Sequence, residues 1–133
     1  DWNWISAHND LDVQMTNSSE DISLLAVQGP EAVNALRTLT QVDLDNMAYY
    51  SFQIGNFAGV EGVIISATGY TGSGGFELYC KNKYVSGIWK ILFEFTIINK
   101  FQIFKINYYW FNNSLLFACL AFATFNSQYS NAC

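Results

Sequence analysis

The stretch GSGGFELYCKNKYVSGIWKIL, residues 72–92, decides the fold. It opens on closely spaced glycines, whose backbone reaches conformations that other residues avoid, so residues 68–75 are expected to form a loop able to approach a ligand. Apolar and polar side chains then alternate through residues 76–81, the period of a strand with one face on a core. Glu77 is therefore predicted to point away from that core.

A helix is predicted directly after this strand, from Asn82 to near Phe95. Asn82 is a favourable N-cap, because its side chain can accept a hydrogen bond from a free backbone N–H of the first turn. Apolar residues follow at helical spacing and predict one buried stripe: Val85, Ile88, Trp89 and Leu92. The strand and this helix are thus expected to pack on each other.

The residues before the glycine loop predict the rest of the domain. The expected elements are a helix over 2–9, strands over 13–17 and 22–27 joined as a hairpin, a helix from Pro30 with the stripe Ala32, Ala35, Leu36 and Leu39, and strands over 50–57 and 60–67. Helices and strands in this order predict an α+β fold, with a mostly antiparallel sheet and helices packed on one face.

Composition excludes several classes of protein. The 133 residues are 51% hydrophobic and 13% charged, which predicts a packed core. A net charge of −5 with only six basic residues argues against a nucleic-acid partner. The longest apolar run, residues 115–125, is shorter than the roughly 20 residues that span a bilayer, so no membrane association is expected.

No catalytic or metal site is predicted from the titratable residues. The three cysteines show no paired spacing, and His8 has no partner at metal-ligand spacing, so we expect no metal and no catalytic triad. His8 is interpreted as an ordinary helix residue. Asp43 and Asp45 follow the second helix, where capping or solvation explains them more simply than acid–base chemistry.

The chain changes composition near residue 95. Residues 96–133 contain no Gly, Pro, Asp or Glu, the residues that usually form turns, caps and solvated faces. We therefore predict a domain over residues 1–95 and treat 96–133 as an unrelated or out-of-frame apolar tail that is not native to the fold.

The glycine loop and Glu77 form the candidate binding site. The loop has no Gly-Lys-Ser/Thr sequence and leads into a strand, which excludes the common phosphate-binding loops. It is either a flexible hairpin connection or a ligand-binding turn. Glu77 is either a solvated carboxylate or an acceptor for two parallel N–H groups, such as the edge of a pterin or guanine.

Two motifs in combination resemble one family. LLAVQGP (residues 24–30) and TGYTGSGGFEL (residues 68–78) are similar to motifs of the aminomethyltransferase, or T-protein, family of the glycine cleavage system. The resemblance covers about residues 1–95 and predicts an internal fragment of such a protein. It implies that Glu77 binds tetrahydrofolate and that Tyr70, Gly69 and Gly72 shape the pocket wall. Ser73 stands where the family usually has an acidic residue.

The resemblance also implies a reaction that this chain is expected to lack in isolation. Family members transfer an aminomethyl group from the lipoylated H-protein to tetrahydrofolate, releasing ammonia and methylenetetrahydrofolate. The family's catalytic aspartate lies upstream of the segment that matches Asp1, so we expect no catalytic residue here. The expected location is the cytoplasm, or the mitochondrial matrix in a eukaryote. The alternative is a non-enzymatic α+β folate-binding or interaction module.

Overall fold

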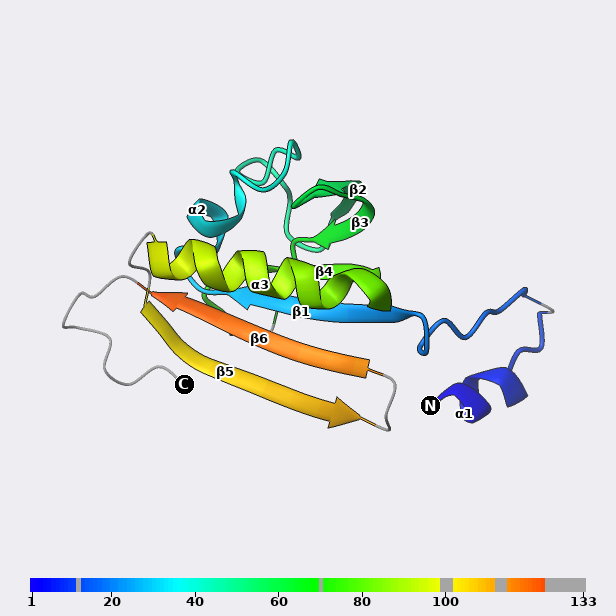
Figure 1. Cartoon of the computed structure of the whole chain (residues 1–133). Coiled ribbons are helices and arrows are strands. Elements are labelled where there is room, and N and C mark those ends of the chain that lie inside the picture. The colour runs from blue at the N-terminus through cyan, green and yellow to red at the C-terminus, as the bar shows by residue number, and fades with distance from the viewer. Residues whose placement is uncertain (12, 70, 99–101, 112–114, 124–133) are drawn as a thin grey trace.

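The computed structural model describes residues 1–11, 13–69, 71–98, 102–111 and 115–123 (Figure 1). Its elements are α1 (Trp2–Ala7), β1 (Ile22–Gln28), α2 (Ala32–Leu36), β2 (Phe52–Phe57), β3 (Val60–Ser66), β4 (Gly75–Lys81), α3 (Asn82–Ile98), β5 (Gln102–Phe111) and β6 (Leu115–Ala123). No helix in these ranges has the length and apolar character needed to cross a membrane.

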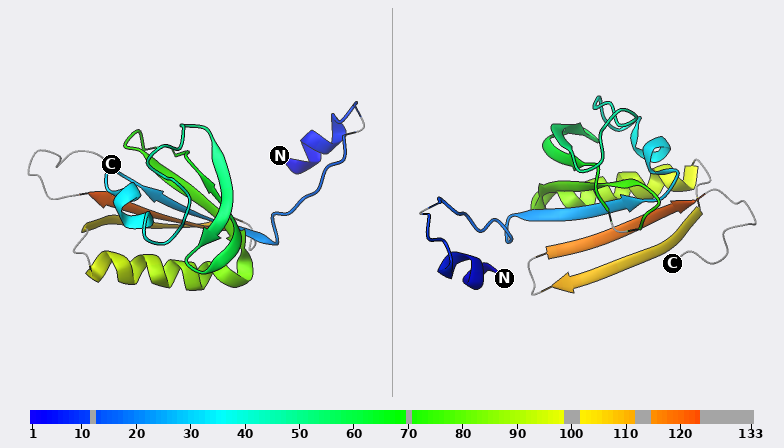
Figure 2. Two further views of the ribbon diagram at one scale, coloured as in Figure 1. Left: turned by 90° about the horizontal axis from the view of Figure 1, so that it is seen from above. Right: turned by 180° about the vertical axis from the view of Figure 1, so that it is seen from behind.

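The strands form one sheet in the order β2-β3-β4-β1-β6-β5. Every neighbouring pair is antiparallel except β1 and β6, which run parallel. Helices α2 and α3 pack on the same face of this sheet (Figure 2). The predicted α+β fold, with a mostly antiparallel sheet and helices on one face, is confirmed.

The core lies between that sheet face and the two helices. From α3, Val85, Ile88 and Leu92 are buried, and Trp89 packs against the same cluster. Leu25 of β1 and Leu78 of β4 oppose each other across the sheet and are at most 1% exposed. Because each such side chain contributes about 1.5–3 kcal/mol on burial, this layer stabilises the fold strongly.

The predicted apolar stripe of α2 is confirmed, although the helix is shorter than expected. Ala32, Ala35 and Leu36 are buried, and Leu39 packs against the core just beyond the helix end. Pro30 and Glu31 precede the first helical residue. The helical spacing predicts which residues are buried better than it predicts where the helix begins.

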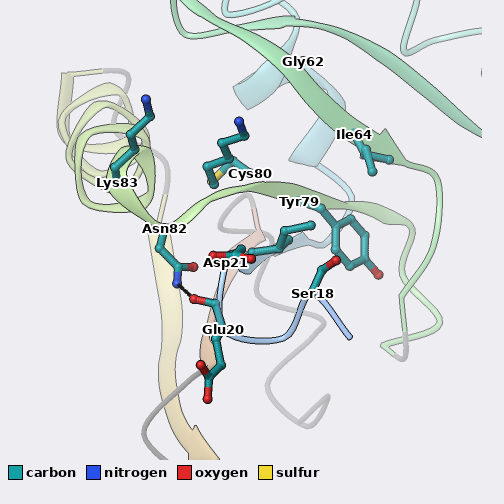
Figure 3. Close-up of a pocket in the computed structure, with 11 residues that line it drawn as sticks. Ser18, Glu20, Asp21, Gly62, Ile64, Tyr79, Cys80, Asn82 and Lys83 are labelled. Carbon is teal, nitrogen blue, oxygen red and sulfur yellow. Dashed lines mark hydrogen bonds between the residues drawn. The ribbon is translucent and has the colours of Figure 1, made fainter. Parts of the chain in front are cut away.

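Asn82 joins the start of α3 to the neighbouring strand. Its Oδ1 accepts a hydrogen bond of 2.6 Å from Ser23 Oγ. Its Nδ2 donates one of 2.6 Å to the Glu20 carbonyl, which Figure 3 shows. Both partners come from the chain entering β1. Asn82 is the first residue of α3, and its side chain bonds to the chain entering β1 instead of making the predicted N-cap contact.

The predicted strand over 13–17 and its hairpin with 22–27 are wrong. Residues 13–17 form no strand, and β1 pairs instead with β4 and β6. The Asn9 side chain explains the difference at Val13, because its Nδ2 donates to the Val13 carbonyl at 2.7 Å and its Oδ1 accepts from the Val13 N–H at 3.1 Å. The side-chain amide thus takes the groups that a neighbouring strand would use.

Helix α1 stands apart from the core, since none of its residues is buried. Trp4 is 66% exposed and Leu11 is 87% exposed. Figures 1 and 2 show this N-terminal segment extending away from the sheet. The short helix predicted over 2–9 is present, but it does not contribute to the layer formed by α2 and α3.

The C-terminal residues contribute β5 and β6 to the sheet. Strand β6 lies beside β1, with Leu24 opposite Phe117 and Gln28 opposite Ala121. The interpretation of residues 96–133 as an unrelated tail, with a domain over 1–95, stays a prediction.

Candidate functional site

Glu77 lies on the face of the sheet opposite α2 and α3. Its strand neighbours Phe76 and Leu78 are buried in the core, whereas Glu77 is half-buried. In the sheet it is opposite Ala26 of β1 on one side and Ser66 of β3 on the other. The predicted direction of Glu77, away from the core, is therefore what strand β4 shows.

One oxygen of the Glu77 carboxylate accepts two hydrogen bonds from nearby hydroxyl groups. Thr68 Oγ1 donates to Oε2 at 2.6 Å, and Tyr79 donates to the same oxygen at 3.1 Å. Thr68 Oγ1 also lies 3.1 Å from Ser66 Oγ. Within the described residues Oε1 accepts no hydrogen bond, so the two oxygens of the carboxylate differ in their contacts.

The surroundings of Tyr79 raise the pKa of its hydroxyl group. Burial, the negative charge of Glu77 and the hydrogen bond to Glu77 together raise the pKa of Tyr79 from 10.0 to about 12, with burial the largest cause. The Tyr79 hydroxyl group therefore stays protonated, and able to donate to Glu77, at pH values well above neutral. Burial also raises the pKa of the Cys80 thiol, whose side chain lies on the core face.

Gln28 holds the base of the glycine loop. The side chain is only 3% exposed, and its Nε2 donates to the carbonyls of Thr68 and Phe76, each at 3.2 Å. Its Oε1 accepts a longer hydrogen bond of 3.4 Å from Thr71 Oγ1. These contacts join Thr68, the first residue of the loop, to Phe76 in the strand that follows. Gln28 therefore fixes where Thr68 meets Glu77.

Gly69 and Gly75 fit closely around Gln28. A Cβ atom at Gly69 would lie 1.8 Å from Gln28 Oε1, and one at Gly75 would lie 2.5 Å from the Val27 carbonyl oxygen. Gly75 also has a φ of +140°, a conformation that side chains disfavour. Glycine is thus required at Gly75 by close approach to backbone atoms and by backbone conformation, whereas a side chain at Gly69 would displace the Gln28 side chain.

A cavity of about 350 Å³ lies beside the loop. It is lined by Gln28, Tyr49, Thr68, Gly69, Gly72 and Gly74. The predicted pocket-wall residues Gly69 and Gly72 both border it, and Thr68 connects it to Glu77 through the hydrogen bond to Oε2. Tyr70, the other predicted wall residue, lies outside the described residues.

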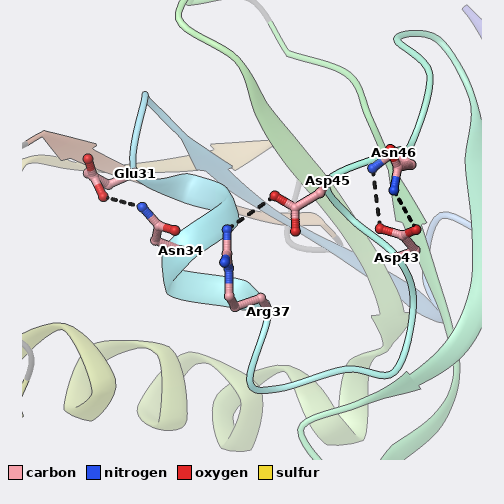
Figure 4. Close-up of polar contacts among 6 residues, drawn as sticks. All are labelled: Glu31, Asn34, Arg37, Asp43, Asp45 and Asn46. Carbon is pink, nitrogen blue, oxygen red and sulfur yellow. Dashed lines mark hydrogen bonds and ion pairs between the residues drawn. The ribbon is translucent and has the colours of Figure 1, made fainter.

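The acidic residues after α2 take part in local polar contacts. Arg37 forms an ion pair of 3.1 Å with Asp45, and Asp43 accepts hydrogen bonds from the backbone and side chain of Asn46 (Figure 4). Asn34 donates to Glu31 in the same region. These exposed contacts agree with capping and solvation rather than with acid–base chemistry.

His8 is an exposed residue at the end of α1. Its Nδ1 lies 2.8 Å from the Trp4 carbonyl oxygen, and its ring stacks on Trp4 with centroids 4.2 Å apart. In the part of the chain that the structure describes, no three His, Cys, Asp or Glu side chains gather in a group that could hold a metal ion.

Sequence reasoning missed three residues that shape the site. Gln28 was visible as a polar residue at the end of the apolar run 22–27, a position where a buried side chain needs hydrogen-bond partners. Tyr79 shares the face of Glu77 by strand alternation. Thr68 could not be placed, because its contact with Glu77 depends on how the loop folds back over β4.

Comparison with known proteins agrees with the motifs. The family model described as GCVT N-terminal domain matches residues 1–102. Relatives named aminomethyltransferase are 63% identical in Flavobacterium psychrophilum, 53% in Bacteroides thetaiotaomicron and 50% in Porphyromonas gingivalis, each over 94 residues. These matches cover 71% of this chain and 26% of each relative.

The family match includes the whole described site, from Gln28 through the glycine loop to Tyr79. It also includes every residue of the described buried cluster, from Leu25 to Leu92. The chain therefore belongs to the GCVT N-terminal domain family.

Proposed function

We propose that this chain carries part of the tetrahydrofolate-binding region of a glycine-cleavage aminomethyltransferase, with Glu77 as the anchor for the pterin ring. The observation that supports this most directly is the half-buried carboxylate whose Oε1 accepts no hydrogen bond from the described residues. A pterin offers adjacent N–H groups on one edge, and an ionised carboxylate accepts such groups strongly.

The residues present fit such a ring in several respects. The cavity of about 350 Å³ beside the loop is within the range of small-molecule sites. Gly69 and Gly72 add no side chains to its wall, and Thr68, which lines the cavity, donates a hydrogen bond to Glu77, which is not itself a lining residue. In this proposal Glu77 binds and orients the ring, and Gln28 keeps the loop in place.

The reaction proposed for the longer protein is transfer of an aminomethyl group from the lipoyl arm of H-protein to tetrahydrofolate, with release of ammonia. Lipoylated H-protein would be the protein partner, and the cytoplasm, or the mitochondrial matrix in a eukaryote, would be the location. Because the chain spans 26% of the length of its relatives, we propose binding, and not turnover, for this chain alone.

Calorimetric titration of the chain with tetrahydrofolate, under anaerobic conditions, tests the proposal. Glu77→Ala should weaken binding by about 1.5–3 kcal/mol, the range for a hydrogen bond to a charged group. Glu94→Ala is the matched control, because Glu94 is an exposed carboxylate on α3 that pairs with Lys90. Equal affinities of the wild-type chain and Glu77→Ala would remove Glu77 from the site, leaving a non-enzymatic interaction module as the better description.

A further inference from the structure

The two oxygens of Glu77 are not equally available. A carboxylate oxygen offers roughly two lone-pair directions, and both directions of Oε2 are used by Thr68 and Tyr79. A ligand edge with two parallel N–H groups binds best when each group meets a different oxygen. One of the two hydroxyl groups must therefore release Oε2 before such an edge binds in this way.

Tyr79 is the hydroxyl group better able to leave. Its hydrogen bond to Oε2 is 3.1 Å long, against 2.6 Å for Thr68. Thr68 is also held through its carbonyl by the buried Gln28 side chain, which fixes the loop around it. Release of Thr68 would disturb the loop, whereas release of Tyr79 needs only a side-chain movement.

Space for that movement lies beside the Tyr79 ring. The ring borders a cleft of about 250 Å³ formed with Ser18, Ile22 and Leu24, and a larger one of about 670 Å³ that includes Ile64 and Lys81. Figure 3 shows Tyr79 between Ile64 and Ser18. The hydroxyl group is thus close to open space while it donates to Glu77.

We propose that Tyr79 occupies the place of one ligand N–H on Glu77 and is displaced when a ligand with two adjacent N–H groups binds. Tyr79 is then a specificity-determining residue. A two-donor edge compensates for the lost hydrogen bond, whereas a single donor binds at Oε1 and leaves Tyr79 where it is. This inference rests on the proposed binding of tetrahydrofolate at Glu77.

The test compares two ligands and two variants in the full chain. The ligands are tetrahydrofolate and an analogue in which methyl replaces the 2-amino group, so that a single N–H remains on that edge. Tyr79→Phe removes the competing hydroxyl and should tighten tetrahydrofolate binding by about threefold to tenfold, the effect of one net hydrogen bond. Affinity for the analogue should change less than about twofold, a difference too small to reflect such a bond.

Two controls separate this role from a structural one. Tyr84→Phe removes another tyrosine hydroxyl, on α3, where the ring lies under Lys83, and should leave both affinities unchanged. In a Glu77→Gln background, where the charged acceptor is absent, Tyr79→Phe should also have no effect on either ligand. A gain in affinity that needs both Glu77 and the 2-amino group is not expected from a change in packing.

The outcomes distinguish the inference from the proposed function. If the wild-type chain does not bind tetrahydrofolate, the proposed function fails and the inference fails with it. If the wild-type chain binds but Tyr79→Phe binds equally or more weakly, the displacement of Tyr79 is wrong while the proposed function stands. An equal gain for tetrahydrofolate and the analogue would also overturn the displacement.

Discussion

At the scale of single residues, Tyr79 reports on the charge of Glu77. The two side chains are two positions apart on β4 and share one face of the sheet, so the hydroxyl lies 3.1 Å from Oε2. Burial alone disfavours the tyrosinate, and a carboxylate at this distance disfavours it more. Ionisation of Tyr79 is thus a measure of the site that needs no ligand.

Glu77→Gln should lower the pKa of Tyr79 from about 12 toward 10.0, without reaching it, because burial remains after the charge is removed. Ultraviolet absorbance of the tyrosinate, recorded as the difference between each protein and its Tyr79→Phe counterpart, isolates this one group. An unchanged pKa in Glu77→Gln would show that the two side chains are not in contact in solution.

The raised pKa of Tyr79 makes the stability of the fold depend on pH in the alkaline range. The folded-state pKa is above the unfolded value, so the neutral hydroxyl stabilises the fold fully below pH 10.0, and this contribution is lost as pH rises through about 12. Urea unfolding across this window should therefore show a steeper loss of stability for the wild-type chain than for Tyr79→Phe. Parallel curves would contradict the shift.

At the scale of elements, the glycine loop and β4 depend on the lack of side chains at their junction. Gly75 has a φ of +140° and approaches the backbone of β1 closely, since an added Cβ would lie 2.7 Å from Gln28 Cα. Backbone atoms in the sheet cannot move aside as a flexible side chain can. The first residue of β4 is therefore more restricted than the glycines at the loop tip.

Gly75→Ala should destabilise the chain by about 2 kcal/mol or more, because overpacking adds to the cost of the backbone conformation. Gly87→Ala is the matched control on α3, where an added Cβ meets nothing within 4 Å. That change should stabilise the chain by up to about 1 kcal/mol, the difference in helix propensity. Urea denaturation measures both, and equal effects would contradict the close approach at Gly75.

Local periodicity explains which elements could be predicted. The alternation in β4 and the stripe of Val85, Ile88 and Leu92 in α3 each follow from residues close in sequence, and both are confirmed. Residues 13–17 have no such support, because a strand also needs a partner that the sequence does not reveal. Asn9 satisfies Val13 locally, so that strand does not form.

The site could be predicted less completely than the fold. Alternation places Glu77 away from the core, but the hydroxyl groups that meet its Oε2 come from β4 itself and from the end of the loop. The Tyr79 contact follows from strand geometry. The Thr68 contact depends on the register of β3 and β4 and on the Gln28 hydrogen bonds, which are long-range in sequence.

At the scale of the whole molecule, the buried cluster that the structure describes is built from residues of β1 through α3. Its members all lie between Leu25 and Leu92, on the face that α2 and α3 cover. Strands β5 and β6 extend the sheet beyond β1 instead. Whether residues 96–133 are native to the fold can therefore be tested by removing them.

A shortened chain of residues 1–98 should keep a cooperative unfolding transition, because it retains every residue of the buried cluster that the structure describes. It should also self-associate more than the full chain, since loss of β6 leaves the backbone of β1 unpaired along one edge. Urea denaturation and light scattering over a range of concentrations measure the two effects. A shortened chain without a transition would show that the tail is part of the folding unit.

The two hydrogen bonds that Gln28 Nε2 gives to Thr68 and Phe76 have a consequence for how this region tolerates change. This single amide group holds the two ends of the glycine loop together, so the exposed residue Ser73 can change while the two ends keep their spacing. Insertion of a new segment beside Ser73 should therefore leave the flanking strands β3 and β4 undisturbed.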